Sequence, residues 1–214
     1  MAKGLTKAAI VSEALALLDE VGMDGLTVRV LAARLDVKAP ALYWHVRDKG
    51  ELLDEMATEV WRAIGVQLLV GAEARSWDAD LRHFADVLRG ALLEHRDGAK
   101  VFSGTYMTDA SVLAAQEDGL ARWIAQGFPL SAVVRAFTLL SGFVVGFCIE
   151  EQAVAQADAR QQYDPEVRAE RVGAAHPLVV EAGGEIFGDR DEQFTSLVDL
   201  VVDAVGRLRA SARR

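Results

Sequence analysis

The sequence predicts an all-α protein, and three observations support that prediction. Apolar residues recur at three- and four-residue steps over several long segments of the 214-residue chain, as in helices that bury one face. No segment alternates apolar and polar residues for long enough to indicate a strand. The chain has only 4 prolines, and none interrupts a long periodic run. With 51% hydrophobic and 26% charged residues, it can build a packed core.

Three helices are predicted at the N-terminal end. The first spans residues 6–21, where apolar residues form one stripe, and a glycine follows it. The second spans about residues 27–35 and begins at Thr27, whose hydroxyl suits an N-cap. The third is short, about residues 39–45, and Pro40 fits its first turn because that position needs no backbone N–H donor.

The remainder is predicted to form longer helices. One begins near Lys49, because Asp48 followed three residues later by Glu51 is an aspartate variant of the capping box. Periodicity predicts the others over residues 76–94, 110–126, 130–156 and 191–210. Residues 157–177 are polar and contain two prolines, so we expect a loop there with at most one short helix.

The apolar middle of the chain is predicted to be a buried helix. Its longest uncharged stretch, residues 136–149, has 14 residues, whereas a membrane-spanning helix needs ~17–25. We therefore expect no membrane association. The single cysteine, Cys148, allows no internal disulfide, and no secretion leader is evident at the N-terminus. A reducing, cytoplasmic compartment is expected.

Charge is distributed unevenly along the chain. The net charge of −9 argues against binding of polyanions over the whole surface. Residues 1–50, however, carry seven Lys or Arg against six Asp or Glu. Within residues 38–49, three basic residues and His45 face one acid. A nucleic-acid surface, if present, should be compact and confined to this end.

The second and third predicted helices have the spacing of a helix-turn-helix, in which the second helix enters the DNA major groove. The spacing alone fits a packing corner equally well. Tyr43, Trp44 and His45 are too many bulky groups for the thin buried side of so short a helix, so some must face outward. Hydroxyl and imidazole groups reach phosphates, and the small Ala39 and Ala41 allow close approach to base edges. Alternatively, Tyr43 and Trp44 fasten this helix to its neighbours.

Several motifs here resemble the DNA-binding domain of the TetR family of transcriptional repressors. They are Thr27-Val28-Arg29, Leu42-Tyr43-Trp44-His45-Val46, Lys49 and Leu52-Leu53, within about residues 6–60. Residues 95–105 are similar to the ligand domain of the tetracycline-repressor branch of that family. The resemblance implies that two copies of the chain read a palindromic operator in successive major grooves.

The resemblance also implies particular contacts with double-stranded DNA. Arg29 matches an arginine that reads bases, able to bind guanine through two hydrogen bonds. Pro40 and Tyr43 match contacts of the recognition helix, and His45 and Lys49 match phosphate contacts. The expected DNA-binding residues are Thr27, Arg29, Lys38, Ala39, Pro40, Ala41, Tyr43, Trp44, His45 and Lys49. Ala39, Ala41 and Val28 depart from the tetracycline-repressor pattern, which leaves the operator sequence open.

A ligand site is implied, but its metal ligands are missing. In the tetracycline-repressor branch the drug is held as a magnesium chelate by a histidine and nearby polar groups. Phe102 stands at the position of that histidine, and a phenyl ring cannot coordinate Mg²⁺, which prefers oxygen ligands. Other polar positions are replaced at Gly65, Phe84 and Gly119, whereas Thr105 and Glu150 remain. We therefore expect a site with no metal and no cofactor.

The expected cavity is aromatic and apolar, with a few polar groups that orient the ligand. The candidate ligand contacts are Phe84, Leu88, Phe102, Thr105, Tyr106, Gln116, Trp123, Phe137 and Phe147. Met107 is a further candidate for the cavity lining, and most residues of these types are expected to be core. His83, His95 and His176 lack the spacing of metal ligands and are expected at the surface. Cys148 is expected to be a buried apolar residue.

A homodimer is predicted from the two long apolar helices. Residues 130–156 contain Ser141, Gly142 and Gly146, small residues that allow close helix approach. The last helix carries a wide apolar stripe. The resemblance implies that these helices form a four-helix bundle between two copies, although either helix fits a core role as well. Because one short helix with few cations binds DNA weakly alone, two copies are favoured.

The sequence therefore predicts an all-α chain of two parts. Residues 1–47 form a three-helix helix-turn-helix DNA-binding domain, and residues 48–214 form a helical ligand-binding and dimerisation domain. The predicted function is a repressor released from a palindromic operator by a small apolar or aromatic inducer without metal.

Two alternatives differ in class. A helical enzyme would require a nucleophile and base, a phosphate loop or a metal set, and the sequence shows none. A dimer that binds small molecules or partners and no longer binds DNA fits the net charge.

Overall fold

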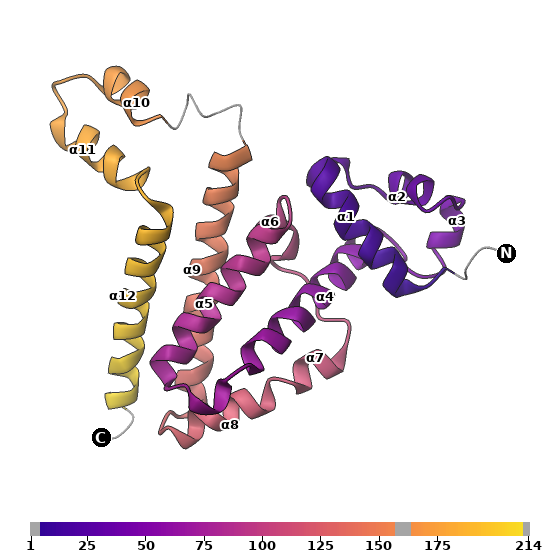
Figure 1. The fold of residues 1–214 in the computed structure, drawn as a ribbon, viewed down its shortest axis with the longest axis horizontal. Helices are drawn as coiled ribbons and strands as arrows, with labels where there is room; N and C mark the ends of the chain where they lie inside the picture. Colours follow the sequence, from indigo (N-terminus) through magenta and orange to yellow (C-terminus); the bar gives the residue numbers. More distant parts are fainter. Residues whose placement is uncertain (1–4, 157–163, 212–214) are drawn as a thin grey trace.

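The computed structural model describes residues 5–156 and 164–211, and within these ranges the chain is helical with no strand (Figure 1). The helices predicted over residues 6–21, from Lys49, and over 76–94, 130–156 and 191–210 are present, and the all-α prediction is confirmed. The helices are α1 (Lys7–Gly25), α2 (Val28–Arg34), α3 (Ala39–Leu42), α4 (Lys49–Leu69), α5 (Trp77–Glu94), α6 (Gly98–Phe102), α7 (Ala110–Ala114), α8 (Glu117–Ala125), α9 (Leu130–Gln156), α10 (Pro165–Val172), α11 (Pro177–Ile186) and α12 (Arg190–Ser211), with a 3₁₀ turn at Ala72–Ala74.

Helices α1 to α3 form a lobe at one end of the molecule, and α4 leads from it into the body (Figure 1). The hydroxyl of Thr6 accepts from the Ala9 N–H at 3.2 Å and caps α1. That of Thr27 accepts from the Val30 N–H at 3.2 Å and caps α2. Leu42, fully buried, anchors α3 beneath the lobe surface. The two caps and the burial of Leu42 follow from the sequence pattern.

The ends of two N-terminal helices differ from the prediction. Helix α1 continues past Gly22 to Gly25, with a kink at Gly22 where φ is 71°. Only glycine adopts this φ readily, and a Cβ there would stand 3.0 Å from the Asp97 carboxylate. Helix α3 ends at Leu42, because the His45 N–H donates to the Leu42 carbonyl three residues back and the chain turns.

The predicted cap of α4 forms with one change of partner. The Asp48 carboxylate accepts from the Glu51 N–H at 2.9 Å, as a capping box requires. In a capping box the Glu51 carboxylate would accept from the backbone N–H of Asp48, but here it reaches one residue further back, to Arg47. It accepts from both the backbone N–H and the Nε of Arg47, at 2.6 and 2.9 Å. These bonds lower the pKa of Glu51 and fix the segment that joins α3 to α4.

Helices α5, α9 and α12 lie side by side and form the body of the molecule (Figure 1). Between α9 and α12, Phe147 packs on Phe194 with ring centroids 5.3 Å apart. The Arg89 guanidinium lies over the Phe194 ring and pairs with Glu151 through two hydrogen bonds of 2.6 and 3.0 Å. The Arg190 guanidinium lies over the Phe147 ring, 4.1 Å from its centroid. This aromatic and ionic cluster joins α5, α9 and α12.

Helix α9 is the one helix in the described ranges that is long and apolar enough to cross a membrane, by length and composition alone. The predicted helix over residues 130–156 is thus present, but it is only partly buried. Ala136, Leu140 and Val144 face the body of the protein. Val134 and Leu139 are half exposed. One face of α9 packs on α5 and α12, so α9 serves as a core helix. Its other apolar face is exposed.

Three other segments correct the prediction. The helix expected over residues 110–126 is broken into α7 and α8, since the Gln116 N–H donates to Leu113 three residues back and tightens the turn. Helix α6 was not predicted, because five residues are too short for a periodic stripe. Helix α11 was missed as well. Two central glycines and exposed apolar residues hide its pattern.

Part of the predicted 157–177 loop lies outside the described residues. Within the described part, the short helix allowed for that segment is α10, which packs on α11 (Figure 1). The contact is close, because a Cβ on Gly183 would lie 3.1 Å from the Arg168 Nε. Together α10 and α11 form a small lobe that projects from the top of α9 and α12 (Figure 1).

Cys148 is fully buried on α9, as predicted for a small apolar residue. Burial raises the pKa of its thiol to about 12, so at pH 8 the thiol stays protonated and is a poor nucleophile. We expect no reaction with Ellman's reagent at pH 8 while the protein is folded, and one thiol per chain after denaturation. Rapid reaction of the folded protein, in a sample shown by circular dichroism to be native, would contradict this placement.

Candidate DNA-binding surface and ligand cavity

The end of the α1–α3 lobe presents two large aromatic side chains to solvent. Trp44 is 88% exposed and Tyr43 is 52% exposed, although both directly follow the buried Leu42. The alternative that these rings fasten α3 to its neighbours is therefore wrong. Exposed aromatic rings gain free energy when they are buried, and the folded chain does not bury these two. They are therefore free to contact a binding partner.

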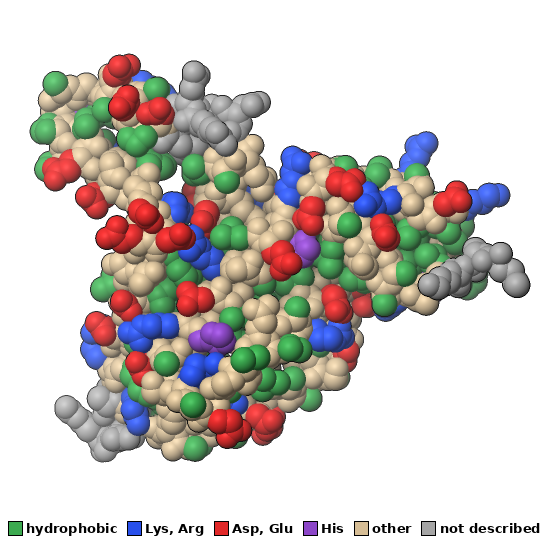
Figure 2. Space-filling model, viewed as in Figure 1, with side chains coloured by type: hydrophobic (Ala, Val, Ile, Leu, Met, Phe, Trp, Pro, Cys, Tyr) green, Lys and Arg blue, Asp and Glu red, His purple; other side chains and the backbone are tan. Residues whose placement is uncertain are grey.

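The basic residues of this lobe divide into two groups. Arg34 pairs with Glu13 and Glu20 of α1, at 2.9 and 2.7 Å, and so holds α2 against α1 instead of facing outward without a partner. Arg29 and Lys38 are exposed, and neither forms an ion pair or side-chain hydrogen bond within the described part of the chain. Figure 2 shows basic side chains extending from the outer end of the lobe. This end is suited to phosphate and base contacts.

The remaining predicted DNA contacts are placed less uniformly. Thr27 and Pro40 are exposed, whereas Ala39, Ala41 and His45 are half-buried beside Tyr43 and Trp44. Lys49 departs from the expectation. Its ammonium donates to the Met23 carbonyl at 2.8 Å and joins the start of α4 to the end of α1. We therefore interpret Lys49 as a residue that fixes the lobe on α4, not as a free phosphate contact.

A cavity of about 610 Å³ lies among α4 to α9 in the body of the protein. Its rings contact one another: Phe84 and Phe137 have centroids 5.0 Å apart, and Trp123 and Phe137 have centroids 5.2 Å apart. The ligand candidates that line it are Phe84, Phe102, Thr105, Gln116, Trp123 and Phe137. A cavity of this volume with a mostly apolar lining suits a small aromatic molecule.

Three of the nine ligand candidates do not line this cavity. Leu88 is fully buried in the core of α5, and Phe147 is part of the cluster between α9 and α12. The Tyr106 side chain is 73% exposed, because its backbone N–H donates to the Asp54 carboxylate of α4 and turns the ring outward. Met107, the next residue along the chain, lines the cavity in its place.

Sequence reasoning missed the charged part of the cavity. Arg75, Asp80 and Arg122 line it together with the indole ring of Trp61. The Arg75 Nε donates to an Asp80 carboxylate oxygen at 2.7 Å. These residues come from the segment before α5, from α5 and from α8, and they form no sequence motif. Only the fold brings them together, so no pattern in the sequence signals them.

Polar contacts connect the cavity to the α1–α3 lobe. The edge of the Phe102 ring meets the His95 imidazole, with centroids 5.8 Å apart. The His95 Nδ1 lies 3.1 Å from the carboxylate of Asp19 on α1, so this histidine is half-buried at a contact and is not a plain surface residue. The Asp97 carboxylate accepts from the Met23 N–H at 3.0 Å. The α5–α6 turn thus touches both the cavity wall and the end of α1.

Comparison with known proteins identifies the two parts of the chain. Residues 10–56 match the family described as "Bacterial regulatory proteins, tetR family". Residues 70–207 match the domain described as "Tetracyclin repressor-like, C-terminal domain". The chain belongs to the TetR family. It is accordingly a DNA-binding regulator that responds to a small molecule, binds operator DNA and acts as a dimer.

Relatives of this TetR-family chain match it over nearly its full length. The class G tetracycline repressor protein of Vibrio anguillarum is 36% identical over 208 residues, covering 97% of this chain and 96% of its own. A solved structure of a possible TetR family transcriptional regulator from Streptomyces coelicolor A3(2) has a TM-score of 0.83 at 31% identity, covering 95% of this chain and 100% of that one. A variant of TetR from Acinetobacter baumannii AYE in complex with minocycline has a TM-score of 0.75 at 32% identity, covering 96% and 98%.

Among the described residues that line the cavity of this TetR-family chain there is no histidine and no unpaired carboxylate for magnesium. Mg²⁺ requires several oxygen ligands in octahedral geometry. The one carboxylate on the cavity wall, that of Asp80, is already paired with Arg75. Glu150 is exposed on α9 and is absent from the wall, and Phe102 offers no donor atom. No cluster of three or more His, Cys, Asp or Glu residues with metal-binding geometry occurs in the described ranges.

Proposed function

We propose that the protein is a repressor that leaves a palindromic operator when a small aromatic ligand, free of metal, fills the cavity. The observation that supports this most directly is the contact of one short element with both sites. The α5–α6 turn and α6 supply Phe102 to the cavity wall, and they also supply His95 and Asp97 to the end of α1. A ligand that displaces Phe102 therefore acts on the contacts that hold the DNA-binding lobe.

The minocycline complex of the Acinetobacter relative supports a polycyclic aromatic ligand, since that chain has the same fold as this one. The rings of Phe84, Trp123 and Phe137 are suited to stack on such a skeleton. The chemistry of recognition differs here, because the wall lacks a set of metal ligands. We assign the protein no catalytic activity and place it in the cytoplasm with the DNA that it binds.

We propose a division of the chain at residues 47 and 48, with α4 as the mechanical link between the two parts. The proposed dimer interface uses the apolar faces that the single chain leaves exposed. On α9 these include Val134 and Leu139, and on α12 they include Leu197 and Leu200, which are 39% and 62% exposed. Two such pairs of helices form a four-helix bundle and bury these residues. The bundle fixes the separation of the two recognition lobes.

Release then requires only a shift between two states of the dimer. In one state, both α3 helices fit successive major grooves, and in the other their separation is wrong. A ligand that binds the second state about a hundredfold more tightly supplies roughly 2.7 kcal/mol toward it. Asp19 and Asp97 form hydrogen bonds at the α1 contact. The net free energy of a hydrogen bond is comparable to or smaller than this difference in binding free energy, so ligand binding can rearrange these bonds.

The proposal is tested with duplexes selected by the full-length protein from a random library. We expect a palindromic sequence, two chains per duplex, and affinity that falls by at least about tenfold between roughly 50 and 200 mM salt, because each copy displaces phosphate counterions. In a mobility-shift assay, members of a panel of tricyclic and tetracyclic aromatic compounds should release the duplex equally well with and without EDTA. If no sequence is enriched at any salt concentration, the dimer that lacks DNA binding is the better interpretation. Release that requires a divalent ion would contradict the metal-free part.

A further inference from the structure

We propose that the ligand of this cavity is an aromatic acid, and that Arg122 binds its anionic group. This inference rests on the proposed function and specifies the class of ligand for the same site. Of the side chains that line the cavity, three carry charge: Arg75, Asp80 and Arg122. Two guanidinium groups against one carboxylate leave one positive charge on an otherwise mainly apolar wall.

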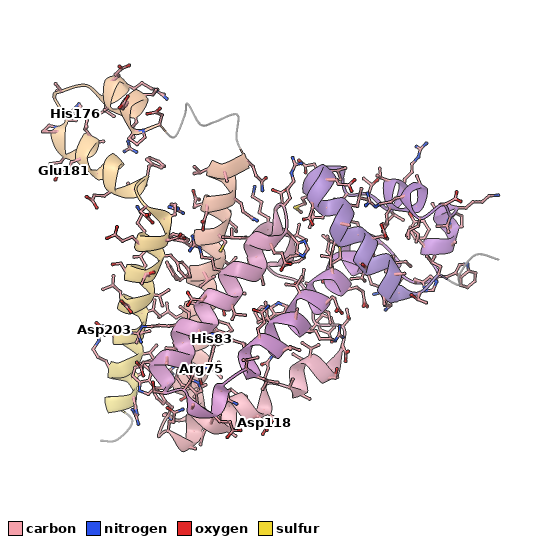
Figure 3. The ribbon with its side chains drawn as sticks, viewed as in Figure 1. Arg75, His83, Asp118, His176, Glu181 and Asp203 are labelled. Atoms are coloured by element: carbon pink, nitrogen blue, oxygen red, sulfur yellow. The ribbon has the colours of Figure 1, made fainter. Side chains whose placement is uncertain are left out.

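Each of the three guanidinium nitrogens of Arg75 donates a hydrogen bond within the protein. Its Nε donates to Asp80 at 2.7 Å, and its two terminal nitrogens donate to the carbonyls of Leu68 and Val70. Those carbonyls end α4, where the last turn has no N–H partners of its own. Arg75, labelled in Figure 3, therefore caps α4 and neutralises Asp80. It lies between α4 and α5, and its charge is already paired with that of Asp80.

Arg122 has no comparable partners. Its nearest acidic atom is an Asp80 oxygen 4.0 Å from a terminal nitrogen, which is beyond hydrogen-bond distance. Its Nε is buried and has no hydrogen-bond partner, and its side chain is 27% exposed in total. Because Asp80 is paired with Arg75 at 2.7 Å, it offsets the charge of Arg122 only weakly, across 4.0 Å. A partly buried guanidinium of this kind is stabilised by an anion that supplies the missing acceptors.

The neighbours of Arg122 determine what else the ligand must contain. The next residue, Trp123, packs its ring against Phe137, and Phe137 packs in turn against Phe84. Arg122 and these three rings line the same cavity, so the skeleton of an anion bound at Arg122 can reach them. The volume of about 610 Å³ accommodates a fused ring system of three or four rings. A planar aromatic skeleton with a carboxylate at one end matches both parts of the wall.

The test compares anthracene-2-carboxylate with anthracene-2-carboxamide, which has the same skeleton but no charge. Both are titrated into the full-length protein at pH 7.5. Binding is followed by quenching of tryptophan fluorescence, since Trp61 and Trp123 line the cavity. We expect the carboxylate to bind at least about tenfold more tightly, the effect of a hydrogen-bonded charge pair. Arg122→Gln should abolish this preference by weakening carboxylate binding alone, whereas Arg122→Lys should retain part of it.

Arg135→Gln provides the matched control, because Arg135 is exposed on α9 and is absent from the cavity wall. It should leave both affinities unchanged. The inference is overturned if the wild-type protein binds the two compounds alike or binds neither. It is equally overturned if Arg122→Gln weakens both compounds to the same degree, which indicates a merely structural role. Operator binding is measured on the same samples without ligand. A protein that binds its operator but shows no preference for the acid refutes only this inference, whereas absence of operator binding refutes the proposed function.

Discussion

Replacing Arg29 and Tyr43 together with alanine should abolish specific operator binding while leaving the fold intact. Arg29 is exposed at the start of α2 without an internal partner, and Tyr43 is 52% exposed after α3. A bidentate contact between arginine and guanine contributes about 1–3 kcal/mol of discrimination, and a dimer makes it twice. The loss from Arg29 alone is therefore about 2–6 kcal/mol for each dimer, or roughly 30- to 10⁴-fold in affinity.

The measurement is fluorescence anisotropy with the selected palindromic duplex and with an unrelated duplex of equal length. Arg29→Ala should reduce affinity for the first toward that for the second. Lys38→Ala removes an exposed cation. It should weaken binding to both duplexes by the same factor and make the salt dependence of binding shallower. Arg135→Ala removes the same charge as Arg29→Ala at a distant site on α9 and should change neither affinity. An unaltered operator affinity of the double variant, in a sample with wild-type circular dichroism, would remove α2 and α3 from the DNA interface.

The DNA-binding lobe was predictable because its signals are local. Thr27 and Asp48 cap helices within three residues of themselves, and Leu42 is the one apolar anchor of a short helix. The exposure of Tyr43 and Trp44 follows from the same local geometry. The bond from the Lys49 ammonium to the Met23 carbonyl, 26 residues earlier, has no such local signal. A contact at that separation depends on how α1 and α4 cross, which periodicity does not reveal.

The cavity was predictable only in its general chemistry. Phe84, Trp123 and Phe137 were identified because aromatic residues on inward helix faces are few. Leu88 lies one turn along α5 from Phe84, and the sequence pattern places both residues on the same face of the helix. Leu88 nevertheless faces the core. The difference depends on which neighbouring helix covers each turn. Arg75 and Arg122 were missed because isolated charged residues carry no periodic signal, and they meet Asp80 only through the packing of separate segments.

Gln152 should be among the most sensitive single positions for stability. This side chain is 5% exposed on α9, and its amide makes three hydrogen bonds. Its Nε2 donates to the carbonyls of Leu92 and His95 at 3.0 and 2.8 Å, and its Oε1 accepts from the Ala99 N–H at 3.1 Å. It is the partner of the Leu92 carbonyl near the end of α5 and of the Ala99 N–H in the first turn of α6, whereas the His95 carbonyl also accepts from the Gly98 N–H at 2.9 Å.

Gln152→Leu removes the side-chain partner of two buried groups, the Leu92 carbonyl and the Ala99 N–H, whereas the His95 carbonyl keeps its bond from the Gly98 N–H. Each of the two unsatisfied buried groups costs about 1–3 kcal/mol, and the added apolar side chain offsets about 1 kcal/mol, so we expect a net loss of about 1–5 kcal/mol. For a chain of this size the loss corresponds to a fall in Tm of roughly 2–20 °C. Differential scanning calorimetry at equal protein concentration checks this, since dimerisation makes Tm depend on concentration. Gln67→Leu, at an exposed site on α4, is the matched control and should change stability by less than about 0.5 kcal/mol. Equal melting of the two variants would show that the α5–α6 turn does not depend on Gln152, and that the path from cavity to lobe is held by other contacts.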